Sequence, residues 1–131
     1  MSKLTILGNK TEGAITKDEL EWFPCPDGVL DAVTFETHEF TSVCPVTNQP
    51  DLYTVKITYM PDQRCVESKS LKLYLMQWRN EGIFGEAITA QIANELFEFL
   101  DPWKIEVTTI QQIRGGLQMT SHAVREAEIA E

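Results

Sequence analysis

The sequence predicts a single α+β domain, residues 1–131, in which two strands, two helices and two further strands follow one another. Three observations predict this order. Apolar and polar side chains alternate twice before residue 60, apolar residues take a helical spacing between 67 and 100, and alternation returns after 104. Two adjacent helices between two pairs of strands can cover one face of an antiparallel sheet.

Residues 1–30 hold glycines and prolines at turn-like positions, so we expect an irregular N-terminal segment that wraps the surface. Apolar and polar side chains then alternate at 33–37 and again at 53–59, which is the period of a half-buried strand. The segment between them, 44–51, is dense in turn residues and is expected to be a loop.

From residue 67 the spacing becomes helical, with apolar side chains at Leu71, Tyr74, Leu75 and Trp78. We expect Gly82 to end this first helix. A second helix then presents one apolar face, formed by Ile88, Ile92, Leu96, Phe99 and Leu100. It stops at Asp101-Pro102, because proline cannot continue the hydrogen-bond ladder.

Alternation at 105–109 predicts a third strand. The turn Arg114-Gly115-Gly116 then leads into a short fourth strand at 117–119. A sheet of four strands leaves backbone groups unpaired on its outer strands, and pairing with neighbouring subunits would remove those edges.

Composition restricts the classes of function. A formal net charge of −9 argues against nonspecific binding to nucleic acid, so we expect no nucleic-acid partner. No apolar run approaches the roughly 20 residues that span a bilayer, and no signal peptide is evident, so we expect a cytoplasmic protein without a membrane partner. The three cysteines and two histidines show no metal-ligand spacing, so we predict no metal site and three thiols.

Two side chains of the 44–51 loop suggest chemistry. Cys44 would be partly exposed there, and a nearby cation, Lys69 or Lys72, would favour its thiolate. Asp51 begins the next strand, where partial burial would keep a carboxyl group protonated and able to donate. The ordinary alternatives are a small buried thiol for Cys44 and a turn-forming or surface carboxylate for Asp51.

The cluster 67–72, with the sequence Glu-Ser-Lys-Ser-Leu-Lys, is expected to open the first helix, where free N–H groups and the helix dipole favour an anion. Lys69 and Lys72 lie one turn apart and could clamp a phosphate, although solvated surface lysines are the alternative. Glu67 and Ser68 also suit helix capping. The sequence has no Gly-x-Gly-x-x-Gly fingerprint, so any dinucleotide would bind differently from a Rossmann fold.

As a set, residues 40–45 around Cys44, Asp51 and the cluster 67–72 resemble the nitrile reductases of the queuosine pathway, the QueF family. The resemblance runs from about 4–8 to 114–116. It implies the tunnelling fold, in which subunits join their sheets into a barrel with active sites between them, most often as a decamer of two stacked pentamers. It also implies reduction of 7-cyano-7-deazaguanine to its aminomethyl form with NADPH, through a covalent cysteine thioimide.

The resemblance also implies residue roles. It makes Cys44 the nucleophile and Asp51 the general acid. The side chains that would hold the deazaguanine are Glu67, Ser68, Phe84 and Glu86. The residues that would meet NADPH are Lys69, Lys72, Arg114 and Gly115.

One position departs from the family. Members typically show Phe-His-Glu where this chain has Phe84-Gly85-Glu86, so the histidine that orients the substrate and assists proton transfer is missing. His38 lies outside the family pattern and could substitute, although a surface strand histidine is the ordinary interpretation. For Glu86 the alternative is a favourable charge in the first turn of a helix.

Two other functions stay open. A relative of the same fold keeps the cysteine and the aspartate but adds ammonia to the thioimide, which makes the amidine of archaeosine on transfer RNA. A non-catalytic deazaguanine-binding protein is the third possibility. The cluster 67–72 favours the reductase because a non-reducing relative needs no cofactor clamp, while Gly85 weakens the reductase and the acidic charge disfavours transfer RNA.

Overall fold

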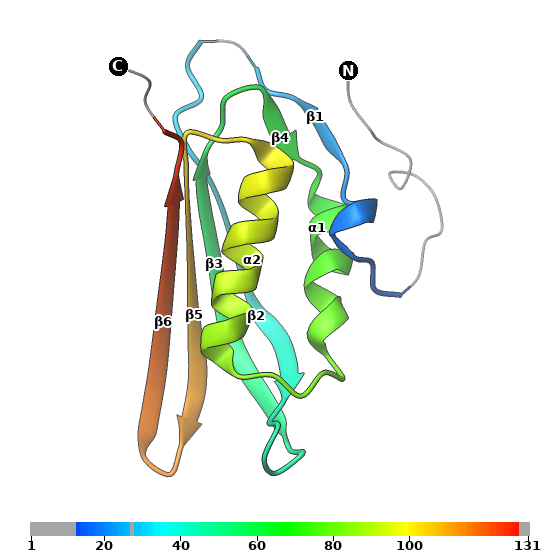
Figure 1. Cartoon of the computed structure of the whole chain (residues 1–131), viewed down its shortest axis with the longest axis vertical. Coiled ribbons are helices and arrows are strands. Elements are labelled where there is room, and N and C mark those ends of the chain that lie inside the picture. The colour runs from blue at the N-terminus through cyan, green and yellow to red at the C-terminus, as the bar shows by residue number, and fades with distance from the viewer. Residues whose placement is uncertain (1–12, 27, 129–131) are drawn as a thin grey trace.

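The structure is a computed structural model that describes residues 13–26 and 28–128. Its main sheet has four antiparallel strands in the order β2-β3-β5-β6 (Figure 1). These strands are β2 (Val33–Val43), β3 (Pro50–Met60), β5 (Lys104–Arg114) and β6 (Leu117–Glu126). The predicted α+β class and the order of its four main strands and two helices are therefore confirmed.

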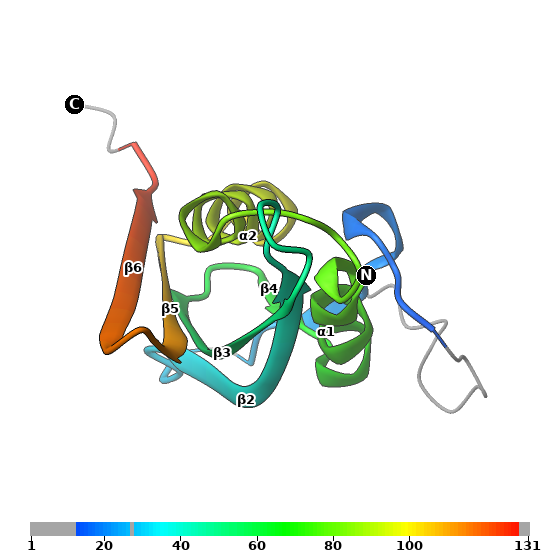
Figure 2. The same ribbon diagram turned by 90° about the horizontal axis from the view of Figure 1, so that it is seen from below.

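Both helices lie on the same face of this sheet, which curves around α2 (Figure 2). On β3 the residues that face the helices are buried, namely Tyr53, Val55, Ile57 and Tyr59. The apolar stripe of α2 (Gly85–Leu100) is fully buried against them at Ile88, Ile92, Leu96 and Leu100. The alternate side chains of the strand and the apolar stripe of the helix therefore pack together in one core.

The first helix is shorter than its apolar spacing predicts. The α1 helix (Ser68–Leu75) gives way to a 3-10 turn, η2 (Met76–Trp78), well before Gly82. Met76 N–H contacts the carbonyl oxygens of both Leu73 and Tyr74, which tightens the chain from α-helical to 3-10 geometry. Trp78 is nevertheless fully buried, so the apolar stripe identified the core side chains correctly.

The strands are longer than predicted. The last strand continues to Glu126, and β2 continues past Thr37 through an irregularity in its pairing with β3. Period-two patterns underestimate such strands, because a bulge shifts the alternation by one residue.

The expectation of an irregular N-terminal segment is wrong for 17–24. This stretch forms a 3-10 turn, η1 (Lys17–Glu19), and a strand, β1 (Trp22–Pro24), which pairs with β4 (Arg64–Val66). Such three-residue strands are too short to show a period. Residues 4–8, where the resemblance begins, lie outside the described residues.

The sheet has two distinct ends in Figure 1. The loop after β2, the first turn of α2 and the turn after β5 lie together at what we name the hairpin end, residues 42–53, 84–86 and 114–117. The start of α1 lies beside β1 and β4 at the other end, which we name the α1 end, residues 64–69. Within the described ranges no helix is long and apolar enough to cross a membrane.

Candidate active site

Cys44 and Asp51 are neighbours at the hairpin end. Cys44 directly follows β2, and Asp51 lies opposite Ser42 in the pairing of β2 with β3. The loop between them is closed by two backbone hydrogen bonds, from Cys44 N–H to Gln49 O at 2.8 Å and from Asn48 N–H to Cys44 O at 2.9 Å. Cys44 and Asp51 are both buried, with 9% and 3% of their surface exposed. The predicted loop thus places a thiol and a carboxyl group side by side.

The loop itself lowers the pKa of Cys44 to about 7. The largest cause is the hydroxyl group of Thr47, followed by the backbone N–H groups of Thr47 and Val46, with a smaller contribution from Arg114. A thiol with this pKa is about half thiolate at neutral pH, and the thiolate is the nucleophilic form. The two helix lysines that we expected to supply the field are not among the causes.

Arg114 connects the two catalytic candidates. Its Nη1 donates a hydrogen bond to Asp51 Oδ1 within an ion pair, and its guanidinium is close enough to Cys44 to help lower the pKa of the thiol. Arg114 therefore lies at the predicted catalytic pair, and its assignment to NADPH stays a prediction. Gly115 and Gly116 form the following turn with φ of 58° and 80°, values that favour glycine, so their presence already has a structural reason.

The start of α2 lies against the Cys44 loop. Ile83 N–H donates to Val43 O at 3.1 Å, and Val43 N–H donates to Glu81 O at 2.9 Å. These bonds bring the next residues, Phe84 and Glu86, to the same end as Cys44. Phe84 caps the helix with its ring more than half exposed, and Glu86 is an exposed charge in the first turn.

Glu67 lies at the α1 end and is the N-cap of α1. Its Oε1 accepts the N–H of Ser70 at 2.7 Å and its Oε2 accepts the N–H of Lys69 at 2.8 Å. Val66 N–H, one residue earlier, bonds the hydroxyl of Tyr59. Tyr59 is eight residues along β3 from Asp51, or about 26 Å at the usual strand rise. The structure therefore separates Glu67 from the catalytic pair within one chain and gives it the capping role.

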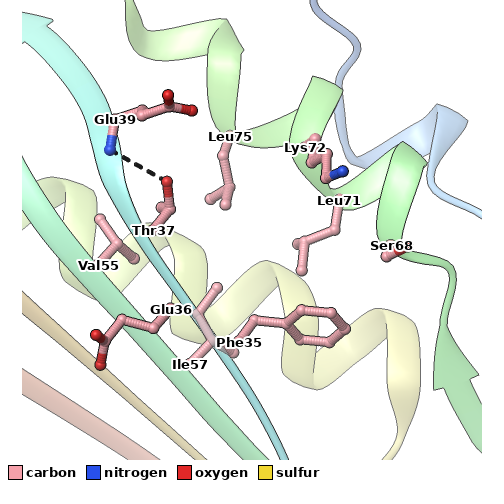
Figure 3. A pocket seen from close by; sticks show the side chains of 10 residues that line it. All are labelled: Phe35, Glu36, Thr37, Glu39, Val55, Ile57, Ser68, Leu71, Lys72 and Leu75. Atoms are coloured by element: carbon pink, nitrogen blue, oxygen red, sulfur yellow. Dashed lines mark hydrogen bonds between the residues drawn. The ribbon is translucent and has the colours of Figure 1, made fainter.

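Lys72 and Ser68 line a groove of about 340 Å³ between α1 and β2. In Figure 3 the apolar side chains of Phe35, Leu71 and Leu75 point into this groove. Its apolar walls suit a flat ring and the ammonium group of Lys72 suits a phosphate, so these residues fit part of a dinucleotide. The carboxylate of Glu39, on the same groove, opposes an anion there, whereas the carboxylate of Glu36 points to the other face of the sheet.

His38 lies on the opposite face of the sheet from the helices. Its ring nitrogens are 3.0 Å from Thr54 Oγ1 and 3.1 Å from Glu36 Oε2. Thr54 belongs to the alternate set of β3 residues, which points away from the core. His38 is thus a surface strand histidine and does not replace the missing family histidine within this chain.

Sequence reasoning missed two hydroxyl groups at the hairpin end, those of Ser42 and Tyr53. Both side chains are buried. A signal was available, because Tyr53 follows Asp51 by two residues and must share its face of the strand. Thr47, the largest influence on Cys44, gave no comparable signal because it lies in an irregular loop.

The model of the family described as QueF-like protein matches residues 50–129. The chain belongs to this family. A protein of Syntrophus aciditrophicus named NADPH-dependent 7-cyano-7-deazaguanine reductase is 44% identical, with 94% of this chain and 86% of that protein covered. Proteins of the same name from Bacteroides fragilis and Helicobacter acinonychis are 44% and 43% identical, covering 92% and 94% of this chain and 82% and 87% of theirs.

A solved structure of the same architecture supports the fold. The crystal structure of the archaeosine synthase QueF-Like in the apo form superposes with a TM-score of 0.69, covering 76% of this chain and 97% of that one. The two sequences are 19% identical, so this likeness concerns the fold alone. It confirms the predicted tunnelling fold of the QueF-like family.

Proposed function

We propose that this chain is an NADPH-dependent reductase that converts the nitrile of 7-cyano-7-deazaguanine into an aminomethyl group, a step of queuosine biosynthesis in the cytoplasm. The observation that carries the proposal is the pairing of Cys44, whose pKa is lowered to about 7, with the buried carboxyl group of Asp51. The names of relatives that are 43–48% identical specify the substrate and the cofactor.

Cys44 and Asp51 would form the covalent intermediate together. The thiol passes its proton to the Asp51 carboxylate, and the thiolate attacks the nitrile carbon. One carbon–sulfur bond forms, one carbon–nitrogen π bond breaks, and Asp51 returns the proton to the nitrogen, which leaves a neutral thioimide on Cys44. Arg114, which pairs with Asp51 and lies close to Cys44, would hold the two groups in register before the substrate arrives.

The first turn of α2 would hold the heterocycle. A guanine-like edge presents adjacent N–H donors, and the Glu86 carboxylate can accept two of them in bidentate fashion. The exposed ring of Phe84 offers a stacking surface beside it. Both assignments rest on the family resemblance and on the backbone hydrogen bond between Ile83 and Val43, which places Phe84 beside the Cys44 loop.

NADPH, when bound, supplies hydride, and the four-electron reduction of a nitrile to a primary amine requires two NADPH per turnover. Lys69 and Lys72 would bind its phosphates at the start of α1, with Arg114 and Gly115 as the other predicted contacts. Glu67 and Ser68 would contact the heterocycle from the same helix start.

We further propose that the working enzyme is a homo-oligomer, a decamer of two pentamers. The starts of α1 and α2 lie at opposite ends of one chain, so one site that uses Glu67 and Glu86 must combine two chains. β2 and β6 are the outer strands of the main sheet and offer the edges for this assembly. Light scattering tests it: an active monomer would contradict the composite site.

The reaction is tested by incubating the protein with 7-cyano-7-deazaguanine, with and without NADPH. Substrate alone should raise the intact mass by one substrate. NADPH should then be consumed at two molecules per nitrile, and only when nitrile is present. Ammonia-dependent amidine formation without NADPH use would identify the transferase instead, and binding without an adduct would identify a non-catalytic protein.

Complementation between variants tests the composite site. Cys44 and Phe84 lie at one end of the chain and Lys72 belongs to α1, so the informative pair is Cys44→Ala with Lys72→Ala. The two variants are co-expressed with different tags and purified through both tags. Recovered turnover in the mixed oligomer would support sites shared between chains, and turnover no higher than in either parent would count against them.

A further inference from the structure

Tyr53 differs from the other tyrosines of this chain in the state of its hydroxyl group. All three tyrosines are buried. The Tyr59 hydroxyl accepts a hydrogen bond from Val66 N–H at 3.0 Å, and the Tyr74 hydroxyl donates one to Glu95 at 2.7 Å. Tyr53, with 2% of its surface exposed, finds no hydrogen-bond partner anywhere in residues 13–26 and 28–128.

A buried hydroxyl without a partner destabilises the fold and needs an explanation. The Ser42 hydroxyl is close enough to influence the pKa of Tyr53, but neither hydroxyl makes a hydrogen bond of acceptable geometry with any described residue. Ser42 lies opposite Asp51, and Tyr53 follows Asp51 by two residues on the same face of β3, so these two hydroxyls lie beside the catalytic pair. The third unsatisfied buried side-chain group of the described residues, Trp78 Nε1, belongs to η2. Structural packing gives no reason for the two hydroxyls, whereas a polar ligand would.

The position of the Tyr53 ring is defined by Gly85. A Cβ atom on Gly85 would lie 3.0 Å from Cε2 and 3.2 Å from the hydroxyl oxygen of Tyr53, and 2.8 Å from Cε of Met119. The backbone of Gly85 does not take a positive φ, so glycine is not required there by conformation. A side chain there is disfavoured by space: the methyl end of Met119 is flexible and can move aside, whereas the Tyr53 ring and hydroxyl fill volume that the side chain would use.

The charged groups that act on the Tyr53 hydroxyl are residues of the candidate active site. Tyr53 lies on the same face of β3 as Asp51, and it feels the charges of Asp51, Glu86 and Arg114. Burial raises the pKa of Tyr53, and the carboxylates of Asp51 and Glu86 act in the same direction. The hydroxyl is therefore protonated at neutral pH and acts as a donor.

We propose that Tyr53 is a further substrate-binding residue, whose hydroxyl donates a hydrogen bond to an acceptor atom of the nitrile substrate between Cys44 and Glu86. It occupies the place of the side chain that the family carries at position 85. This inference rests on the proposed function. It explains in one step why position 85 is glycine and why a buried hydroxyl beside the catalytic pair is left unpaired.

The variant Tyr53→Phe tests the proposal because it removes only the hydroxyl. No hydrogen bond of the described chain is lost, so the melting temperature should not fall. The KM for 7-cyano-7-deazaguanine should rise about tenfold, the effect expected for one lost hydrogen bond. Tyr74→Phe is the matched control: it breaks the bond to Glu95, so it should lower the melting temperature and leave this KM unchanged.

A substrate analogue without the nitrile, 7-deazaguanine, separates the possible acceptors. If the hydroxyl binds the ring, Tyr53→Phe weakens the analogue as much as the substrate. If it binds the nitrile nitrogen, only the substrate is weakened. An unchanged KM in Tyr53→Phe, with wild-type adduct formation intact, would overturn the proposal. Absence of any adduct in the wild-type protein would instead overturn the proposed function.

Exchange of the two side chains gives a second, independent test. Gly85→His alone should lower the melting temperature and the rate of adduct formation, because its Cβ meets the Tyr53 ring as well as the flexible methyl end of Met119. Adding Tyr53→Ala should restore both, because the histidine then takes the vacated space. If the double variant instead loses as much stability and adduct rate as the two single variants together, the side chains at 53 and 85 do not occupy the same space. The inference is then wrong.

Discussion

At the hairpin end the buried hydroxyls of Ser42 and Tyr53 have no partner within the described chain, whereas at the α1 end both carboxylate oxygens of Glu67 accept backbone N–H groups. The cysteine thiols at the two ends also differ, in the direction of their pKa shifts. The loop lowers the pKa of Cys44, while burial raises the pKa of Cys65. The two unsatisfied hydroxyls and the thiol whose pKa is lowered thus lie together at the hairpin end.

This difference separates two uses of polar residues in one small domain. At the α1 end Glu67 and Ser70 satisfy the first turn of a helix, and Ser70 Oγ also accepts the N–H of Glu21 at 3.1 Å. Such a network stabilises the fold. At the hairpin end the groups are held close together by the loop and the α2 start but are left incompletely satisfied, as a binding site requires before its ligand arrives. The predictions below test this division, beginning with the largest effect.

Cys44→Ala should abolish the covalent adduct and all turnover, because it removes the thiol whose pKa the loop lowers and which lies beside Asp51. Intact mass spectrometry after incubation with 7-cyano-7-deazaguanine checks this. Cys65→Ala is the matched control at the other end and should keep the adduct. An adduct that survives in Cys44→Ala would move the chemistry away from the hairpin end.

Asp51→Asn should lower the rate of adduct formation by about 10²- to 10⁴-fold, the usual contribution of a positioned acid or base. The amide keeps the size of the side chain but can neither take the thiol proton nor return it. Stopped incubations followed by mass spectrometry give the rate. A loss below threefold would show that water, and not Asp51, moves the proton.

Lys72→Ala should raise the KM for NADPH by about 10- to 100-fold, the range for one lost charge-assisted hydrogen bond to a phosphate. Adduct formation without NADPH should stay normal, because Lys72 is proposed to bind the phosphates of NADPH and not the nitrile. Lys104→Ala, a surface lysine on β5 paired with two glutamates, is the control for the loss of a positive charge. Equal effects of both variants would point to net charge alone.

Thr47→Val should shift the pH profile of Cys44 alkylation upward. The Thr47 hydroxyl is the largest cause of the pKa near 7, and without it the value moves back towards 9.0. The thiolate fraction at pH 7 falls accordingly, by about fivefold for a shift of about one unit. Rates of iodoacetamide labelling should converge above pH 10, where both proteins are fully ionised. A change in the plateau instead of the midpoint would indicate altered access.

Much of this comparison follows from element order. Two consecutive helices joined by the short segment around Gly82 run antiparallel, so their starts must lie at opposite ends of the sheet. The sequence could therefore have separated Glu67 from Glu86. The face shared by Asp51 and Tyr53 follows equally from the strand period.

The contact between Arg114 and Asp51 could not be predicted in this way. These residues are 63 positions apart, and their contact depends on the register of β3 against β5, which begins with Tyr53 opposite Gln111. Register is set by side-chain packing over the whole sheet and not by any local pattern. The pairing of β1 with β4 could not be predicted from the sequence either, because strands of three residues show no period.

The smallest effect on activity is expected at Glu67, where the structural and functional interpretations can be separated. Glu67→Ala removes the cap and should cost about 1–2 kcal/mol of unfolding free energy. Glu67→Ser keeps an oxygen that can accept the same N–H groups, so its stability should stay close to wild type. If Glu67 is only a cap, Glu67→Ser keeps the wild-type KM for 7-cyano-7-deazaguanine. If its carboxylate also binds the heterocycle from a neighbouring chain, this KM rises about tenfold or more in both variants although Glu67→Ser remains stable. Urea unfolding and steady-state kinetics on the same samples therefore decide whether the α1 end serves the fold alone.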